Sequence, residues 1–349
     1  MLQNTLTLGG SDLFIVPGSP PKVKVNGRFE TIGNTRLSPQ ATQSLIEQTY
    51  AAARGRDTAL LFEKGDDDFS FSVEKMCRFR CNAYQQRGTL AATYRVVAFG
   101  LPDEKQLNIP EIVMKQAERL NGMVLVAGAA GSGKSTTLAC MVNRINSMRA
   151  GHIITIEDPI EFLHSHRMSL VSQREVPNDV PTFQAALRAA LRQAPDVIML
   201  GEMRDHETMQ TAITAAETGH LLLSSLHTVG AAKTIDRIVD AFPPNQQQQI
   251  RIQLSMVLKA VVSQRLVPAV TGEMLPIFEV MVVNSAVQNM IRDGKTHQID
   301  NVIYTGSADG TMLSMDFELI RLVKEGKITK ETALIFALNP ETLKKRLGA

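Results

Sequence analysis

The chain has 349 residues, of which 44% are hydrophobic and 21% are charged, and its 37 basic and 35 acidic residues leave a formal net charge of +2. This is the composition of a folded globular protein long enough for two domains. The near balance of charge argues against a chain whose main task is to grip nucleic acid, and no apolar run reaches the roughly 18 residues that span a bilayer. The first residues lack the basic start and apolar core of a secretory signal, so we expect a cytoplasmic protein.

The three cysteines are too few and too irregularly spaced for a disulfide framework or a four-ligand zinc site. We expect Cys77, Cys81 and Cys140 to be small packing residues of the core.

Residues 1–98 predict a small α+β domain. Asn26-Gly27 separates two alternating stretches and predicts a hairpin, and Ser38 before Pro39 predicts the start of a helix. A second pair of strand-like stretches is broken near Arg87-Gly88. Glycine and proline residues at 99–110 predict a linker.

A second domain is predicted over 111–349. Up to about residue 245, short apolar runs alternate with helical patterns, which indicates a largely parallel sheet with covering helices. Beyond 245 the pattern is mostly helical, with one strand-like piece at 275–283, and the run Gln246–Gln249 suits a solvated helix face. The sequence therefore predicts a two-domain α/β protein.

The segment GAAGSGKS, residues 128–135, fits the phosphate-binding pattern G-x-x-x-x-G-K-[ST]. It follows an apolar run at 123–127 and opens a helical pattern at 136–147, as the motif requires. Glycines let backbone N–H groups approach phosphates, and the helix N-terminus favours negative charge. Lys134 is expected on the β- and γ-phosphates and the Ser135 hydroxyl on Mg²⁺. The expected nucleotide contacts are Gly128, Gly131, Ser132, Gly133, Lys134, Ser135 and Thr136.

Acidic residues follow two other apolar runs. One run leads into Glu157, Asp158 and Glu161, and the next ends at Glu202. Because ligands of open α/β sheets bind beyond the carboxyl ends of the strands, both acidic groups are expected at the crevice that holds the phosphates. ATP hydrolysis needs a carboxylate to orient water and an acidic group near Mg²⁺, so the sequence predicts an ATPase.

Two histidines bracket a third strand-like run. His227 stands at its carboxyl end and His220 at its start, so His227 is the stronger candidate for the same crevice.

The segments GSGKSTTL, TIEDPIEF, GEMRD, AAETGH, SLHT and TIDRIVD together resemble the secretion and type IV pilus ATPases, most closely the pilus retraction ATPases of that family. The resemblance extends from SDLFIV near the start to LVKEGKIT near the end. It implies a PAS-like N-terminal domain, then a RecA-like P-loop ATPase domain with a helical C-terminal part. It also implies a homohexameric ring at the cytoplasmic face of the inner membrane.

The resemblance implies roles for individual residues. Glu161 matches the family's general base for water, and Glu202 matches an atypical Walker B glutamate that holds Mg²⁺ through water. His220 and His227 match a box that couples nucleotide state to movement, and Glu157 and Asp158 belong to the acidic box beside the nucleotide. Candidate arginines that reach nucleotide are Arg80, Arg95 and Arg237.

Several features favour retraction over assembly. Assembly ATPases usually carry a further N-terminal domain and a four-cysteine zinc element, and this sequence shows neither. A C-terminal motif associated with retraction, AIRNLIRE, has its counterpart at 286–293, with Gln288 for the arginine and Asp293 for the glutamate. Ala129 and Ala130 replace the commoner Pro-Thr of the phosphate loop, where backbone groups do the binding.

The sequence thus predicts a motor for pilus retraction and twitching motility. Its partners would be a platform protein of the inner membrane and, indirectly, pilin, with no nucleic acid. Three alternatives stay open: an accessory motor, which the ETMQ and VSQRLV segments favour, an assembly or secretion ATPase, and a nucleotide-dependent scaffold with little turnover.

Overall fold

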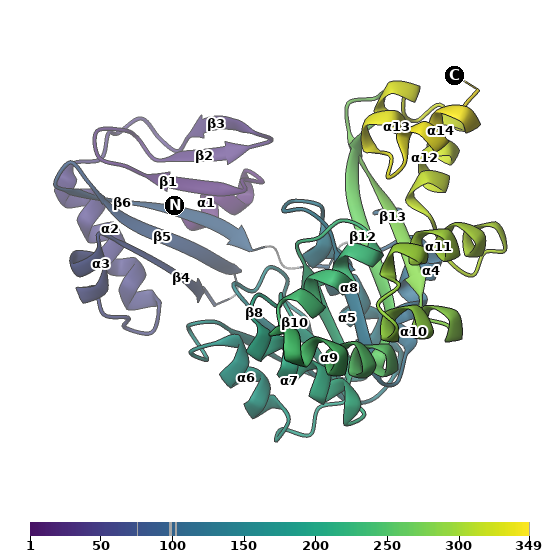
Figure 1. The fold of residues 1–349 in the computed structure, drawn as a ribbon. Coiled ribbons are helices and arrows are strands. Elements are labelled where there is room, and N and C mark those ends of the chain that lie inside the picture. The colour runs from purple at the N-terminus through teal and green to yellow at the C-terminus, as the bar shows by residue number, and fades with distance from the viewer. Residues whose placement is uncertain (75, 98–99, 102, 349) are drawn as a thin grey trace. The chain divides into compact units, whose positions relative to one another are not determined.

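The computed structural model describes residues 1–74, 76–97, 100–101 and 103–348 (Figure 1). The chain divides into two compact units, Met1–Gly100 with Pro159–Leu163, and Leu101–Asp158 with His164–Ala349. Positions 98, 99 and 102, at the predicted domain border and linker, lie outside the described residues.

The first unit is built on a six-stranded sheet with the order β3-β2-β1-β6-β5-β4, and every neighbouring pair is antiparallel. Its elements are α1 (Leu2–Thr7), β1 (Asp12–Ile15), β2 (Lys22–Val25), β3 (Arg28–Thr31), α2 (Pro39–Ala52), α3 (Ala59–Lys64), β4 (Asp66–Ser72), β5 (Arg78–Gln86) and β6 (Thr89–Val97).

Local sequence explains this sheet. Asn26 and Gly27 both have positive φ, +48° and +79°, which the tight turn between β2 and β3 requires. The Ser38 hydroxyl accepts a hydrogen bond from the Ala41 N–H at 3.1 Å and so caps α2. Alternate residues of β5, such as Phe79, are buried in one core with side chains of α2. The predicted hairpin and helix start are confirmed, and all three cysteines are buried.

The second unit contains a seven-stranded sheet with the order β13-β12-β7-β11-β10-β8-β9. Six strands are parallel, and β13 runs antiparallel to β12 at one edge. The strands are β7 (Gly122–Ala127), β8 (His152–Glu157), β9 (Leu170–Glu175), β10 (Val197–Leu200), β11 (Leu221–Leu226), β12 (Leu258–Pro268) and β13 (Met274–Val282).

Helices accompany this sheet along the chain. They are α4 (Glu111–Met114), η1 (Lys115–Glu118), α5 (Lys134–Met148), α6 (Phe183–Ala190), α7 (His206–Glu217), α8 (Ala231–Asp240), α9 (Pro244–Val257), α10 (Ser285–Arg292), η2 (Thr296–Gln298), α11 (Ile299–Ala308), α12 (Met315–Lys324), α13 (Lys330–Phe336) and α14 (Pro340–Arg346).

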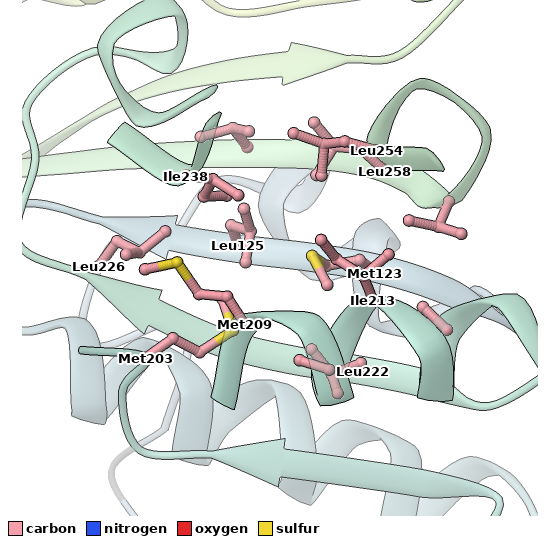
Figure 2. Packing of buried hydrophobic residues seen from close by; sticks show 14 of the residues in the cluster. Met123, Leu125, Met203, Met209, Ile213, Leu222, Leu226, Ile238, Leu254 and Leu258 are labelled. Carbon is pink, nitrogen blue, oxygen red and sulfur yellow. The ribbon is translucent and has the colours of Figure 1, made fainter. Parts of the chain in front are cut away.

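Strand β7 is buried on both faces. Met123 and Leu125 pack into one core with residues of α7, α8 and α9, such as Ile213 and Leu254 (Figure 2). Val124 and Val126 point into a second core that includes residues of α5. Burial on both faces is expected for a parallel strand, and it produces the continuous apolar run seen in the sequence.

One prediction was wrong. Residues 258–268 were expected to be helical, but they form β12, which pairs with β7 and β13. The β-branched pair Val261–Val262 suits a strand, but Lys259, Gln264 and Arg265 do not alternate with apolar residues as they would along a half-buried strand. Strand β9 was also not singled out, because exposed Leu170 and polar neighbours hide the period of this edge strand.

Candidate functional site

The phosphate loop 128–133 connects β7 to α5. Gly131 and Gly133 have φ of +75° and +87°, in the left-handed region that favours glycine. A Cβ atom on Gly128 would lie 2.4 Å from the backbone oxygen of Gln264, which only glycine avoids. Close packing therefore requires glycine at position 128, and the left-handed backbone favours it at positions 131 and 133.

The loop presents groups suited to an anion. Lys134 is buried, and its Nζ donates to the backbone oxygens of Gly128 and Ala129 at 3.0 and 2.9 Å. The buried Ser132 hydroxyl has no hydrogen-bond partner among the described residues. An ammonium group and an unsatisfied hydroxyl at the start of a 15-residue helix fit a bound phosphate. Ser135 is exposed in the first turn of α5, and Thr136 is half-buried beside it.

Gln264 on β12 supports this loop. No local sequence pattern predicts this role, because the residue that it contacts, Thr137, is far away along the chain. Its Oε1 accepts a hydrogen bond from the Thr137 hydroxyl at 2.7 Å. A Cβ atom on Gly133 would lie 2.9 Å from its Nε2. Gln264 thus packs against both the end of the loop and the first turn of α5.

The carboxyl ends of four neighbouring parallel strands share one edge of the sheet. The phosphate loop follows β7, His227 follows β11, Glu202 follows β10, and Asp158 follows β8. Asp158 is exposed there. The structure therefore brings these residues to the same edge, as the positions at strand ends predicted.

Glu202 is at the centre of a charged cluster. Its Oε1 lies 2.6 Å from Nη2 of Arg204, and its Oε2 lies 3.3 Å from Nε2 of His227. Burial opposes ionisation of this carboxyl, but the hydrogen bonds and charges of Arg204 and His227 outweigh burial and lower the pKa of Glu202. Glu202 is therefore ionised at neutral pH, and Arg204 is a site residue that the sequence analysis did not single out.

Glu157 is buried at the end of β8 and is held within the sheet. Its Oε1 accepts hydrogen bonds from the Thr155 hydroxyl at 2.7 Å and from Nε2 of Gln173 at 3.1 Å. These bonds hold the Glu157 side chain at the end of β8, just before the acidic segment Pro159–Leu163, which belongs to the first unit. Glu161 is exposed on that segment.

Other predicted residues are not brought to this cluster. His220 stands at the opposite end of β11, where its Nδ1 donates to the backbone oxygen of Ala215 at 3.0 Å. At roughly 3.3 Å per residue, β11 separates it from His227 by about 20 Å. Arg237 is exposed on α8.

The two arginines of the first unit are cross-strand neighbours. Arg80 and Arg95 are opposite one another in the pairing of β5 with β6. Nε of Arg80 donates to Asp68 at 3.0 Å, and Nε of Arg95 donates to Asp12 at 2.9 Å. The side chain of Arg95 is 68% exposed. Their contact with nucleotide stays a prediction.

A cavity of about 300 Å³ adjoins the start of α5. Its lining includes Asn108, Ile109, Thr136, Gln264 and Phe278. This volume is at the lower end of the range for small-molecule sites, and the lining combines apolar and amide groups. Gly133 is also among its lining residues, so the cavity lies directly beside the phosphate loop.

Comparisons with known proteins agree with this geometry. The model of the family described as type II/IV secretion system protein matches residues 90–315. The type IV pilus retraction ATPase PilT of Pseudomonas aeruginosa is 41% identical over 333 residues, which cover 95% of this chain and 96% of the relative. The type IV pilus ATPase PilU of the same organism is 40% identical, with 97% of this chain and 87% of the relative covered.

A solved structure is also similar throughout. The crystal structure of the pilus retraction motor PilT with bound ADP superimposes with a TM-score of 0.90 and 43% identity, covering 99% of this chain and 98% of that chain.

Proposed function

The chain belongs to the type II/IV secretion system protein family, and we propose that it is the hexameric, ATP-hydrolysing motor of type IV pilus retraction. It is an ATPase with an N-terminal domain and a RecA-like domain. The observation that carries the proposal is the placing of the phosphate loop, His227 and Glu202 on one sheet edge in a chain so similar to a retraction motor.

The roles of the phosphate-loop residues follow from their chemistry. Backbone N–H groups of 131–136 would surround the phosphates, and Lys134 would exchange its loop carbonyls for the β- and γ-phosphate oxygens. The cavity beside Thr136 and Gln264 would hold the nucleoside.

A magnesium ion fits the oxygen donors that this edge offers. The exposed Ser135 hydroxyl and the ionised Glu202, acting through water, would hold it. When bound, Mg²⁺ neutralises charge that develops on the phosphates. His227 and Arg204 would keep Glu202 ionised and oriented toward that ion.

Glu161 is proposed as the general base that takes a proton from the attacking water. Arg80, Arg95 and Arg237 are proposed to add positive charge where nucleotide is held between subunits of a ring, and His220 to pass changes of nucleotide state to a neighbouring surface. The negative charge of the transferred phosphoryl group is what such arginines would stabilise.

The described part of the chain contains no helix both long and apolar enough to cross a membrane. We propose that the ring works in the cytoplasm and is held at the inner membrane by a platform protein, through which it removes pilin from the fibre.

The Glu161→Gln variant tests the chemistry. It should bind ATP as the wild type does and lose at least about 100-fold in kcat, because an amide cannot take the proton. Steady-state ATPase assays and nucleotide titrations of the purified chain measure both. The matched control is Glu63→Gln, an exposed glutamate of the first unit, which should keep full activity. Hydrolysis at the wild-type rate by Glu161→Gln would remove this residue from the mechanism.

Cells test the direction of work. Cells that lack the chain, and cells that carry only Glu161→Gln, should display excess surface pili and lose twitching motility. Bald cells would instead mean an assembly motor. Unchanged pili would favour an accessory motor, to which the similarity to PilU lends weight. Tight binding without turnover would leave a scaffold, and stimulation of hydrolysis by nucleic acid would contradict the expected partners.

A further inference from the structure

The start of α8 is held by two buried side chains of the hairpin β12–β13. Oε1 of Glu279 accepts a hydrogen bond from the Ala231 N–H at 2.9 Å, and Glu279 is only 2% exposed. Oγ of Ser263 accepts from the Gly230 N–H at 2.9 Å and is fully buried. Ser263 and Glu279 are opposite one another in the strand pairing. Together they satisfy two N–H groups that a helix start leaves without partners.

The loop 227–230 begins with His227 and ends at this start of α8. The near end of this loop is fixed as well, because the backbone oxygen of Leu226 accepts from the Gly128 N–H at 3.1 Å. Inside the loop, the Thr228 hydroxyl lies 2.8 Å from the hydroxyl of Thr234 on α8. A short loop anchored at both ends has little freedom, so its anchors determine where His227 lies.

A carboxylate is a costly group to bury for a single backbone hydrogen bond. Burial, with the negative charges of Asp300 and Asp316, raises the pKa of Glu279 to about 7, although the Ala231 N–H works in the opposite direction. A neutral side chain would cap α8 at lower cost. What the Glu279 side chain does provide is a hydrogen bond from the hairpin to Ala231, at the end of the loop that carries His227.

We propose that Glu279, together with Ser263, is a positioning residue for ATP hydrolysis. It fixes the loop 227–230 so that His227 stays within hydrogen-bonding distance of Glu202, and so it connects the hairpin β12–β13 to the edge of the sheet that carries Glu202. The inference rests on the proposed role of Glu202 and His227 in the ATPase.

Kinetics of the purified, full chain test this. Glu279→Ala should lower kcat for ATP by about tenfold or more and change KM by less than about twofold, since the phosphate loop is untouched. Glu279→Gln keeps an oxygen that accepts from Ala231, so it should retain at least half of the wild-type kcat. Adding Glu279→Ala to His227→Ala should cause no further loss, because both act through the same hydrogen bond.

The matched control is Glu318→Ala. Glu318 is also a buried carboxylate of the second unit, but it accepts from Nε of Arg321 on the same helix, α12, at 3.0 Å. This variant should lower thermal stability and leave kcat near the wild-type value. An equal loss of kcat in Glu318→Ala, or additive losses in the double variant, would mean general destabilisation and would overturn the inference. So would full activity in a folded Glu279→Ala chain.

A second measurement does not depend on turnover. The side-chain NMR signal of His227, in a histidine-labelled chain and assigned by its loss in His227→Gln, should shift in Glu279→Ala and stay in place in Glu318→Ala. An unchanged signal would overturn the inference. If the signal shifts in Glu279→Ala but the wild-type chain hydrolyses no ATP, the proposed function is overturned and the positioning contact still stands.

Discussion

Gln264 is the residue at which the phosphate loop, α5 and β12 meet. Gln264→Ala removes the acceptor for the Thr137 hydroxyl, which is buried, and leaves a space beside Gly133. Leaving a buried hydroxyl without a partner costs about 1–3 kcal/mol. We expect this variant to raise the KM for ATP several-fold and to lower kcat less, because the loop loses its support while Glu202 is untouched. Steady-state kinetics check this, and an unchanged KM would contradict it.

Glu279 makes the stability of the chain depend on pH. Its pKa is raised in the folded protein from the ordinary value of 4.5 to about 7. As pH rises, the unfolded chain therefore releases this proton at a lower pH than the folded protein does. The free energy of unfolding falls as pH rises from about 4.5 to 7, and it stays at the lower value above pH 7. Glutamine cannot ionise and avoids this loss.

Glu279→Gln should accordingly melt higher than the wild type at pH 8, by on the order of 2–4 °C for each kcal/mol recovered, and by less at pH 5. Thermal unfolding at pH 5, 6.5 and 8 measures the difference. A difference that is the same at all three pH values would show that Glu279 does not titrate in this range.

At the scale of elements, Arg144 joins α5 to the segments that precede β7. Its guanidinium contacts Glu104 at 3.0 Å, Glu111 at 2.5 Å and Glu118 at 2.7 Å. Exposed single ion pairs contribute little, but one arginine that serves three carboxylates forms a network. These contacts join the segment after Leu101 and the α4–η1 turn to the helix that begins at the phosphate loop.

Arg144→Ala should lower the free energy of unfolding by about 1 kcal/mol in dilute buffer, and by less in 1 M salt, where the Debye length is about 3 Å. Chemical denaturation at both salt concentrations checks this. Arg188→Ala, on α6, is a control that should show neither effect. A loss that is independent of salt would mean that the stem of Arg144 acts by packing.

The elements show why sequence alone reached some features and not others. The phosphate loop and the alternation of buried strands with helices are local signals, and the rule that parallel strands end at one edge was enough to group Glu202 with His227. Strand β12 was missed because its polar residues do not alternate with apolar ones. Gln264 bonds to Thr137 and Glu279 to Ala231, pairs far apart along the chain that only the folded sheet brings into contact.

At the scale of the whole molecule, the chain joins two units of different construction. The first has an antiparallel sheet with one polar face, on which the pairs Arg80–Asp68 and Arg95–Asp12 lie. The second has a mostly parallel sheet buried on both faces, with its chemistry at a single edge. The division of roles in the proposed motor matches this: the second unit would hold and hydrolyse the nucleotide, and the first would supply charge to a nucleotide held in the ring.

Strand β7 has neighbours on both sides, β12 and β11, and every one of its residues is buried. Its amide hydrogens can therefore exchange with solvent deuterium only when the whole unit opens, and they should be among the slowest to do so. Such a strand can serve as the stationary reference against which movement elsewhere in the chain is measured.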